Sequence, residues 1–285
     1  MIVASHNGRD SLAKCLTAIH RQRDRGVKEI IVVDNSTDGS AAIVRREFPS
    51  VILVTASVEK LIPELWGIGI AKSTGEIVAL TTSHFVPANT WIYEILSAHE
   101  TEEAGVGGAI ENEESSGLVS WAVYFCRYSP YMLPFRLQGV EDFAADNASY
   151  KRRDLDRVKE TMSNGFWETF VHREMRSRGM SLSRSPRILV KHQKSFSFSG
   201  FMNQRFYHGR QFGESRGGAM SAGRRAGLAM LSPLIPFVYM LRIGRQVFGK
   251  RRNISKLLVS SPVLVMFLLS WSAGEFTGYL SRRGR

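Results

Sequence analysis

The stretch Glu29–Gly39, EIIVVDNSTDG, predicts a buried strand that ends in a polar turn. Residues 30–33 are apolar and β-branched without alternation, which is typical of a parallel strand covered on both faces. The run stops at Asp34. Ligands of open α/β sheets bind beyond the carboxyl ends of the strands, so Asp34 is placed to accept hydrogen bonds from a base or a ribose. A second interpretation is that Asp34, Ser36 and Asp38 only shape the turn and cap the next helix.

Strand and helix patterns alternate on both sides of this stretch. Further strands are expected at residues 2–5, 51–55, 77–80 and 105–110, and helices at about 12–19, 40–48, 61–72 and 91–96. Cys15 falls on the apolar face of the first helix, where we expect it to be buried. After residue 110 the pattern loosens, before a helix at 165–179 and a strand at 188–190. The alternation predicts an α/β fold with a mostly parallel sheet flanked by helices.

The charge of the chain is unevenly distributed. The net charge is +12, but residues 184–285 carry 18 Lys and Arg against only Glu214 and Glu275, whereas residues 1–183 carry 20 Lys and Arg against 24 Asp and Glu. We therefore expect two domains, residues 1–215 and a basic tail at 216–285. Strongly basic segments bind nucleic acid or anionic membranes.

Two apolar runs in the tail favour a membrane over nucleic acid. They cover Ala226–Leu241, which Pro233 and Pro236 interrupt, and Leu257–Leu280. A membrane span needs about 20 apolar residues, so the first run is short and the second is adequate. The number of spans stays open, because a two-span hairpin competes with a surface-lying or re-entrant helix followed by one deeper helix. Isolated stacking aromatics, as nucleic-acid binding would need, do not accompany the charges.

The two cysteines form no CxxC motif, which is compatible with a reducing compartment. The N-terminus enters a strand at once, so we expect no secretory signal, and the first strand is short enough that the true start of the protein can lie upstream. These features predict a protein at the cytoplasmic face of the cell membrane.

Several motifs together resemble the family 2 glycosyltransferases, which have a GT-A (Rossmann-like) fold and use nucleotide-activated sugars. The motifs are similar in order and spacing, and the resemblance covers about residues 1–215. They are Val3–Arg9 (VASHNGR), Val32–Gly39 (VVDNSTDG), Gly75–Leu80 (GEIVAL), and Pro87 with Trp91. The resemblance implies a nucleotide-sugar pocket in which Asp34 contacts the base or ribose. It implies that the same pocket is lined by Ser5, Asn7, Ser36 and Asp38.

One motif departs from the family. The family usually has Asp-x-Asp after the strand at 77–80, holding Mg²⁺ or Mn²⁺ against the sugar diphosphate, whereas this chain has Thr82-Ser83-His84. Hard divalent ions prefer carboxylate oxygens, although imidazole tolerates transition ions. Three interpretations stay open: Ser83 and His84 bind a divalent ion together with His192, His84 hydrogen-bonds to or pairs with a phosphate, or the site is inactive.

The resemblance also implies the catalytic base. Sugar transfer passes through an oxocarbenium-like state, and an inverting enzyme needs a carboxylate to deprotonate the acceptor hydroxyl. Glu168 stands where the family places this carboxylate, and a solvent-facing helix Glu is the alternative. Glu174 is the next candidate. His192 resembles the family's late His near the diphosphate, or is a buried core His.

Arg205 and Arg210 begin the basic segment and bind either phosphates or anionic lipid. We therefore expect a glycosyltransferase that moves a sugar from a nucleotide-sugar to a lipid-linked or envelope-glycan acceptor. The acceptor class rests on the apolar helices of the tail. The alternative is a non-catalytic GT-A-like module that binds nucleotide-sugars in a membrane glycan-assembly system. The sequence does not identify the base, the sugar, the acceptor or the oligomeric state.

Overall fold

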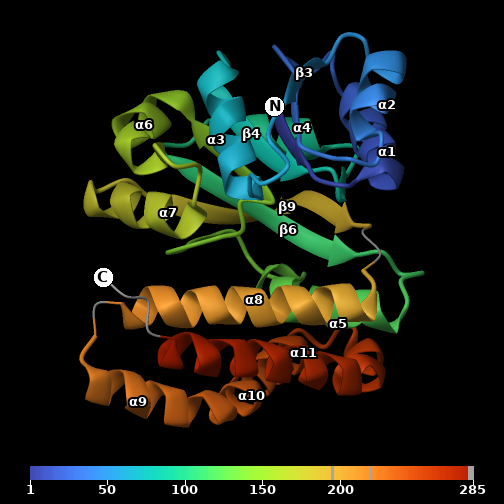
Figure 1. Cartoon of the computed structure of the whole chain (residues 1–285). Coiled ribbons are helices and arrows are strands. Elements are labelled where there is room, and N and C mark those ends of the chain that lie inside the picture. The colour runs from blue at the N-terminus through green and yellow to red at the C-terminus, as the bar shows by residue number, and fades with distance from the viewer. Residues whose placement is uncertain (194–195, 219, 282–285) are drawn as a thin grey trace. The chain divides into compact units, whose positions relative to one another are not determined.

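The computed structural model describes residues 1–193, 196–218 and 220–281 (Figure 1). The chain forms two compact units. The first, which we call the sheet unit, comprises Met1–Glu113 with Tyr131–Lys194, and the second, the helical unit, comprises Glu114–Pro130 with Ser195–Arg285. The compact units do not divide at residue 215, because the helix Phe198–Gly217, which contains this residue, packs with the tail. The functional domain boundary expected there stays a prediction.

The first half of the sheet unit confirms the predicted alternation. Parallel strands lie in the order β3-β2-β1-β4, where β1 is Ile2–Ser5, β2 is Ile31–Asp34, β3 is Ile52–Thr55 and β4 is Ile77–Thr82. The connecting helices are α1 (Arg9–His20), α2 (Ser40–Glu47) and α3 (Ile62–Lys72). In the register, Ser5 is opposite Asp34, and Ala4 is opposite Thr82. The carboxyl ends of β1, β2 and β4 therefore meet at one edge.

The second half of the sheet is mixed rather than parallel. Strand β8 (Asn147–Lys151) lies between β4 and β6 (Gly105–Asn112), antiparallel to both, and β9 (Leu182–His192) follows β6 in parallel. Two short strands, β5 (Phe85–Pro87) and β7 (Gln138–Gly139), pair antiparallel with β9. The α/β fold is confirmed, and β8 is the reason that the sheet is not mostly parallel in this half.

Strand β8 could not be predicted from its sequence pattern, because its buried polar side chains bind partners that are distant in the sequence. The Asn147 amide donates to the carbonyls of Ala109 and Ile188 at 2.8 and 2.9 Å. The Trp91 indole N–H donates to the Asn147 side-chain oxygen at 2.8 Å. Buried polar side chains need such partners, and these come from three other elements of the unit.

Helices cover both faces of the sheet. One face carries the main hydrophobic cluster, with α3, α6 (Arg152–Arg157) and α7 (Glu168–Ser177) over it (Figure 1). Helix α4 (Trp91–Ala98) packs against β9, and α1 packs against β5. A short 3₁₀ helix, Lys159–Met162, precedes α7. Gly69 allows α3 to approach the sheet closely, since a Cβ there would lie 2.4 Å from the Ile2 side chain.

The helical unit consists of α5 (Leu118–Tyr128), α8 (Phe198–Gly217), α9 (Ala222–Leu231), α10 (Ile235–Lys250) and α11 (Ile254–Leu280). Short 3₁₀ turns lie at Ser129–Tyr131 and Ser232–Leu234. Helices α8 and α11 run side by side in Figure 1. Glycines bring their backbones together: a Cβ at Gly213 would lie 2.5 Å from the Glu275 carbonyl, and one at Gly274 would lie 2.1 Å from the Phe206 carbonyl.

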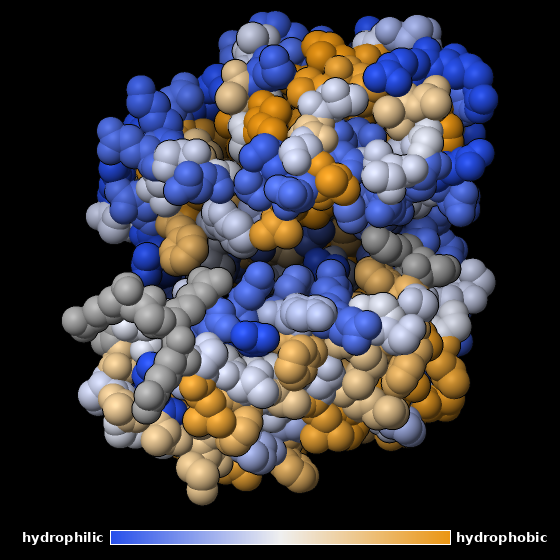
Figure 2. Space-filling model, in the orientation of Figure 1, coloured by the Kyte–Doolittle hydropathy of each residue, from blue (hydrophilic) through white to orange (hydrophobic). Residues whose placement is uncertain are grey.

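Two stretches of the helical unit are long and apolar enough to cross a membrane, Ala222–Lys250 and Ile254–Leu280. The first runs through α9, the turn at Pro233 and α10, so the prolines leave a continuous helical stretch in place. Large apolar side chains are exposed along it, including Met230, Phe237 and Leu241. Figure 2 shows hydrophobic residues gathered over this part of the unit and more hydrophilic ones along α8.

Candidate active site

The ends of β1 and β2 are joined by a hydrogen-bonded cluster. The Ser36 hydroxyl donates to the Asp34 carboxylate at 2.6 Å, and the backbone N–H of Asn7 donates to the Ser36 oxygen at 2.8 Å. The hydroxyls of Ser5 and Ser36 lie 3.5 Å apart. Asn7 has a left-handed backbone, with φ of 49°, which Asn tolerates better than most residues. The structure thus brings Ser5, Asn7, Asp34 and Ser36 together at the edge where ligands of such sheets bind.

Asp38 joins this edge mainly as a structural residue. One of its oxygens accepts the Arg9 backbone N–H at 2.9 Å, and the other accepts the N–H and hydroxyl of Ser40, the first residue of α2. Burial raises the pKa of Asp38, but the hydrogen bonds from Ser40 and Arg9 outweigh burial and hold it below its usual value. Its contacts are therefore those of a helix-start and turn residue.

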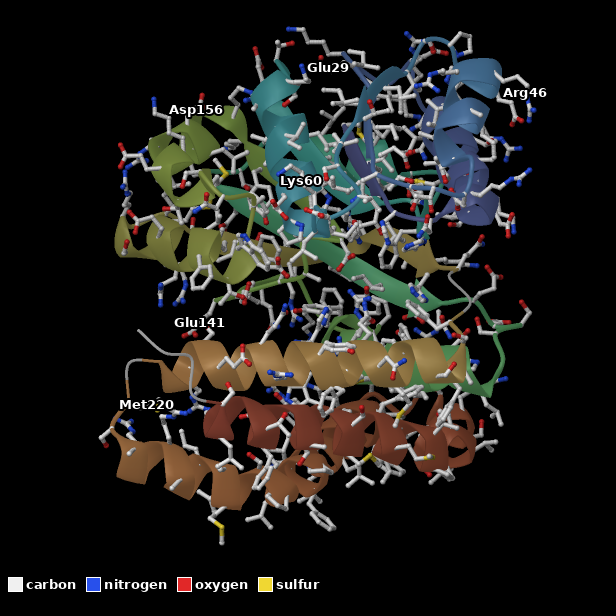
Figure 3. The ribbon with its side chains drawn as sticks, in the orientation of Figure 1. Glu29, Arg46, Lys60, Glu141, Asp156 and Met220 are labelled. Atoms are coloured by element: carbon white, nitrogen blue, oxygen red, sulfur yellow. The ribbon has the colours of Figure 1, made fainter. Side chains whose placement is uncertain are left out.

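Asn35 links this edge to the start of α3. Its side-chain N–H groups face the carbonyls of Ser57, Val58 and Lys60, the last at 2.7 Å, and its oxygen lies 2.9 Å from His6 Nδ1. Lys60, labelled in Figure 3, pairs with Glu64 at 3.1 Å. Sequence reasoning missed Asn35 as an organising residue. Its position directly after Asp34 was the available signal.

Of the three residues in the place of Asp-x-Asp, Thr82 and Ser83 are buried and His84 is half-buried. Ser83 is fully buried, and the hydroxyls of Thr82 and Ser83 have no hydrogen-bond partner among the described residues. A Cβ at Gly8 would lie 2.3 Å from the Ser83 oxygen, so the loop after β1 packs tightly on it. His84 Nδ1 lies 3.3 Å from the Ser11 hydroxyl at the start of α1.

His192 ends β9 close to the same loop. Its register partner on β5 is Phe85, next to His84, and the Gln193 N–H donates to the His84 carbonyl at 2.9 Å. The imidazole is 1% exposed and lies 3.3 Å from the Asn112 side-chain oxygen. Within residues 1–193, 196–218 and 220–281, no group of three or more His, Cys, Asp or Glu side chains is placed to hold a metal ion. A joint metal-binding role of Ser83, His84 and His192 stays a prediction.

Glu168 is the first residue of α7 and is half-buried. The segment before it is fixed against the start of α3. The Phe166 N–H donates to the Pro63 carbonyl at 2.7 Å, and Gly165 adopts a φ of 107° where a Cβ would lie 2.8 Å from Glu64 Cα. The segment before α7 is thus held against the start of α3. Lys60, just before α3, accepts a hydrogen bond from the Asn35 side chain at its carbonyl. Glu174, in contrast, forms an ion pair with Arg178 at 2.6 Å within α7 and its C-terminal cap.

The two predicted phosphate-binding arginines belong to the helical unit. Arg205 stacks over the rings of Phe201 and Trp271, at 4.9 and 5.2 Å from the ring centroids, and burial lowers its pKa. Arg210 pairs with Glu214 at 3.0 Å. Both therefore already have partners within their own unit, and their binding of phosphate stays a prediction.

One pocket of the sheet unit lies at the opposite edge of the sheet. Its volume is about 300 Å³, and residues around the amino ends of β1, β2 and β4 line it, among them Met1, Glu29 and Ile77. None of the predicted catalytic, nucleotide-binding or metal-binding residues lines it. Because ligands of open α/β sheets bind at the carboxyl edge, this pocket is not the candidate site.

The model of glycosyl transferase family 2 matches residues 1–159, more than half of the 285 residues. The chain belongs to glycosyl transferase family 2. The matched range includes the Asp34 cluster and residues 82–84 but ends before Glu168. A comparison with curated proteins finds no match.

Solved structures of GT-A glycosyltransferases share the fold at low sequence identity. The mannosyltransferase PcManGT from Pyrobaculum calidifontis, in complex with GDP-Man and Mn²⁺, is 15% identical, with a TM-score of 0.53, and the match covers 96% of this chain and 86% of that one. S. aureus TarS 1–349, in complex with UDP-GlcNAc, is 11% identical, with a TM-score of 0.50 and coverages of 96% and 89%. Against a longer TarS chain, the match spans 38% of that chain's length.

Proposed function

We propose that this family 2 glycosyltransferase moves a sugar from a nucleotide-sugar donor to a lipid-linked or envelope-glycan acceptor at the cytoplasmic face of the membrane. The observation that carries the proposal is the cluster of Ser5, Asn7, Asp34 and Ser36 at the carboxyl edge of β1 and β2. A carboxylate at such an edge accepts hydrogen bonds from a base or from ribose hydroxyls. The neighbours PcManGT and TarS, which bind GDP-Man and UDP-GlcNAc, support this donor class.

We assign Glu168 as the base that activates the acceptor. Its carboxylate takes the proton of the acceptor hydroxyl, and the freed oxygen forms a bond to the sugar's anomeric carbon. The bond from that carbon to the donor phosphate breaks, and the nucleoside diphosphate leaves with the electron pair. Attack from the face opposite the leaving group inverts the configuration. The position of Glu168 at the first turn of α7, and the ion pair that already engages Glu174, support this choice.

The residues after β4 do not fit a site for Mg²⁺ or Mn²⁺. Such ions prefer carboxylate oxygens, whereas Thr82 and Ser83 offer neutral hydroxyls, and the His84 imidazole faces Ser11. No step is therefore routed through a divalent ion. Hydrogen-bond donors and cations of the protein then have to stabilise the negative charge that develops on the leaving diphosphate.

The helical unit supports a membrane-bound acceptor. Its two long apolar stretches and its exposed apolar side chains on α9, α10 and α11 suit contact with lipid. Arg242, Arg245, Arg251 and Arg252 flank or interrupt the stretches and suit anionic headgroups. An enzyme anchored in this way meets a lipid-linked acceptor directly in the bilayer.

A second candidate is a non-catalytic module that binds nucleotide-sugars. The replacement of the carboxylate motif by buried hydroxyls favours it. A turnover assay separates the two candidates. The full chain is incubated with radiolabelled UDP-GlcNAc or GDP-mannose and bacterial membrane lipids, with EDTA or with added Mn²⁺. Labelled lipid that forms in EDTA supports the enzyme without a divalent ion. Nucleotide binding without label transfer in either condition supports the module.

A further inference from the structure

Three polar side chains form a continuous chain beneath the start of α7. The Tyr150 hydroxyl on β8 lies 2.7 Å from His172 Nε2, and His172 Nδ1 is hydrogen-bonded to an oxygen of Asp142. Tyr150 is fully buried and His172 is 1% exposed, whereas the Asp142 side chain is 44% exposed. The chain therefore runs from the centre of the sheet to the surface of the unit.

The hydrogen-bond directions follow from the chemistry of the three groups. An ionised carboxylate only accepts, so His172 donates from Nδ1 to Asp142. His172 Nε2 then accepts a hydrogen bond from the Tyr150 hydroxyl. Burial raises the pKa of Tyr150 well above its usual value, which keeps the phenol protonated as a donor. The Phe143 ring, with its centroid 4.3 Å from that of His172, packs against the imidazole and fixes its position.

This chain holds the first turn of α7, where Glu168 stands. His172 is four residues after Glu168, on the same side of the helix. The Thr169 hydroxyl, next to Glu168 in the chain, lies 3.4 Å from the second oxygen of Asp142. Glu141, labelled in Figure 3 beside α7, adds a long ion pair to Arg176 at 3.8 Å. Asp142 thus holds the start of α7 on one side. Gly165 and Phe166 hold it against α3 on the other.

We propose that Tyr150, His172 and Asp142 are positioning residues for Glu168: they set where its carboxylate stands relative to the acceptor. The proposal rests on the role given to Glu168 under Proposed function. None of the three has a hydrogen bond to the Asp34 cluster, so losing the chain moves the base without disturbing the donor pocket. A misplacement of about 1 Å costs up to about a hundredfold in rate.

The test measures release of nucleotide from UDP-GlcNAc and GDP-mannose, with water as the acceptor, by the full-length protein in detergent. Tyr150→Phe removes one hydroxyl and keeps the ring. We expect kcat to fall about tenfold or more, with the donor KM unchanged. Asp142→Ala should do the same. Asp142→Asn should restore most of the rate, because its amide oxygen still accepts from His172 and its amide N–H can reach Thr169.

His99→Gln is the matched control. His99 is also a buried imidazole bonded to β8, with Nε2 2.9 Å from the Ser149 hydroxyl, but it lies at the end of α4 and not on α7. We expect it to lower the melting temperature and leave kcat unchanged. If Tyr150→Phe keeps the full kcat, or if His99→Gln loses as much rate at equal loss of stability, the positioning role is contradicted. An unmodified protein that neither releases nucleotide in this assay nor transfers label to membrane lipid from either donor contradicts the proposed function itself, and the positioning role with it.

Discussion

Ser36 couples the ends of two strands through Asp34: its hydroxyl donates to the Asp34 carboxylate across 2.6 Å and accepts the Asn7 backbone N–H across 2.8 Å. One small side chain thereby fixes both the orientation of the carboxylate and the loop that follows β1. A pocket preorganised in this way loses less entropy when it binds a nucleotide. The interpretation of the whole site depends on this arrangement.

Removing the Ser36 hydroxyl should weaken nucleotide binding without unfolding the protein. Ser36→Ala leaves Asp34 without its oriented donor, and a lost hydrogen bond of this kind costs about 1–2 kcal/mol. We expect the Kd for UDP or GDP to rise about five- to thirtyfold, as measured by calorimetric titration. Ser177→Ala, at the far end of α7, is the control and should bind as the parent does. Equal affinity in Ser36→Ala would contradict the role of the cluster.

Glu168 and Glu174 should separate cleanly in a turnover assay. Both lie on α7, but Glu174 already pairs with Arg178 at 2.6 Å. Glu168→Gln keeps the shape and removes the base, so we expect sugar transfer to fall about a hundredfold or more. Glu174→Gln should retain the parent rate, with at most a small loss of stability. A Glu168→Gln variant that still transfers sugar at the parent rate would remove Glu168 from the mechanism.

The crossing of α8 and α11 requires glycine. Gly213→Ala would place a Cβ 2.5 Å from the Glu275 carbonyl, which rigid helix backbones cannot relieve cheaply. We expect a loss of about 1–3 kcal/mol. The matched control is Gly227→Ala on α9, where nothing lies within 4 Å of the new Cβ; it should gain about 0.5–1 kcal/mol from helix propensity. Thermal unfolding in detergent measures both. Equal melting temperatures of the Gly213→Ala and Gly227→Ala variants would show that α8 and α11 do not pack in this way.

His99 makes the sheet unit sensitive to acid. Burial is the main cause that lowers its pKa from 6.5 to about 4. Above pH 6.5 the imidazole is neutral in both the folded and the unfolded state, so its titration does not change the free energy of unfolding. As the pH falls from 6.5 toward 4, only the unfolded chain takes up the proton, and the free energy of unfolding drops by up to about 3 kcal/mol. We expect His99→Gln to flatten urea-unfolding stability across this window, and an unchanged slope would contradict the assignment.

The apolar face of α10 should decide membrane binding. The exposed fractions of Phe237 and Leu241 are 70% and 69%. Replacing both with Glu should greatly reduce co-sedimentation with vesicles of anionic lipid, because a charge at the apolar face opposes insertion. Leu137→Glu is the control, since Leu137 is 67% exposed but lies in the sheet unit. Unchanged sedimentation of the Phe237 and Leu241 double variant would show that this face does not contact lipid.

The parallel half of the sheet could be predicted because its strands are continuous apolar runs, as residues 30–33 show, and its helices have clear apolar faces. Strand β8 could not, because Asn147 and Ser149 are satisfied by partners from distant elements. Helix α5 could not be predicted either, because it lies in the stretch after residue 110 where the apolar pattern loosens. Periodicity reports on local exposure, and it fails where polar groups are buried in pairs.

The candidate site was predictable in part for a similar reason. Asp34 and Ser36 follow a strand end that the sequence displays directly, and hydrogen bonds link them to Ser5 and Asn7, while their binding of a nucleotide-sugar stays a prediction. The Tyr150–His172–Asp142 chain joins residues from a strand, a helix and a loop, which no spacing along the sequence reveals. The stacking of Arg205 on Trp271 could not be predicted, because the two residues are 66 positions apart in the sequence.

The most direct test of the account is a calorimetric titration of the full chain with UDP and with GDP, with and without EDTA, comparing the parent with Asp34→Asn. Asp34→Asn keeps the size of the side chain and removes its charge. The account predicts that at least one nucleotide binds the parent in EDTA and that its affinity falls at least about tenfold in Asp34→Asn. Equal affinity of the two proteins for that nucleotide would contradict the central claim that Asp34 holds the donor.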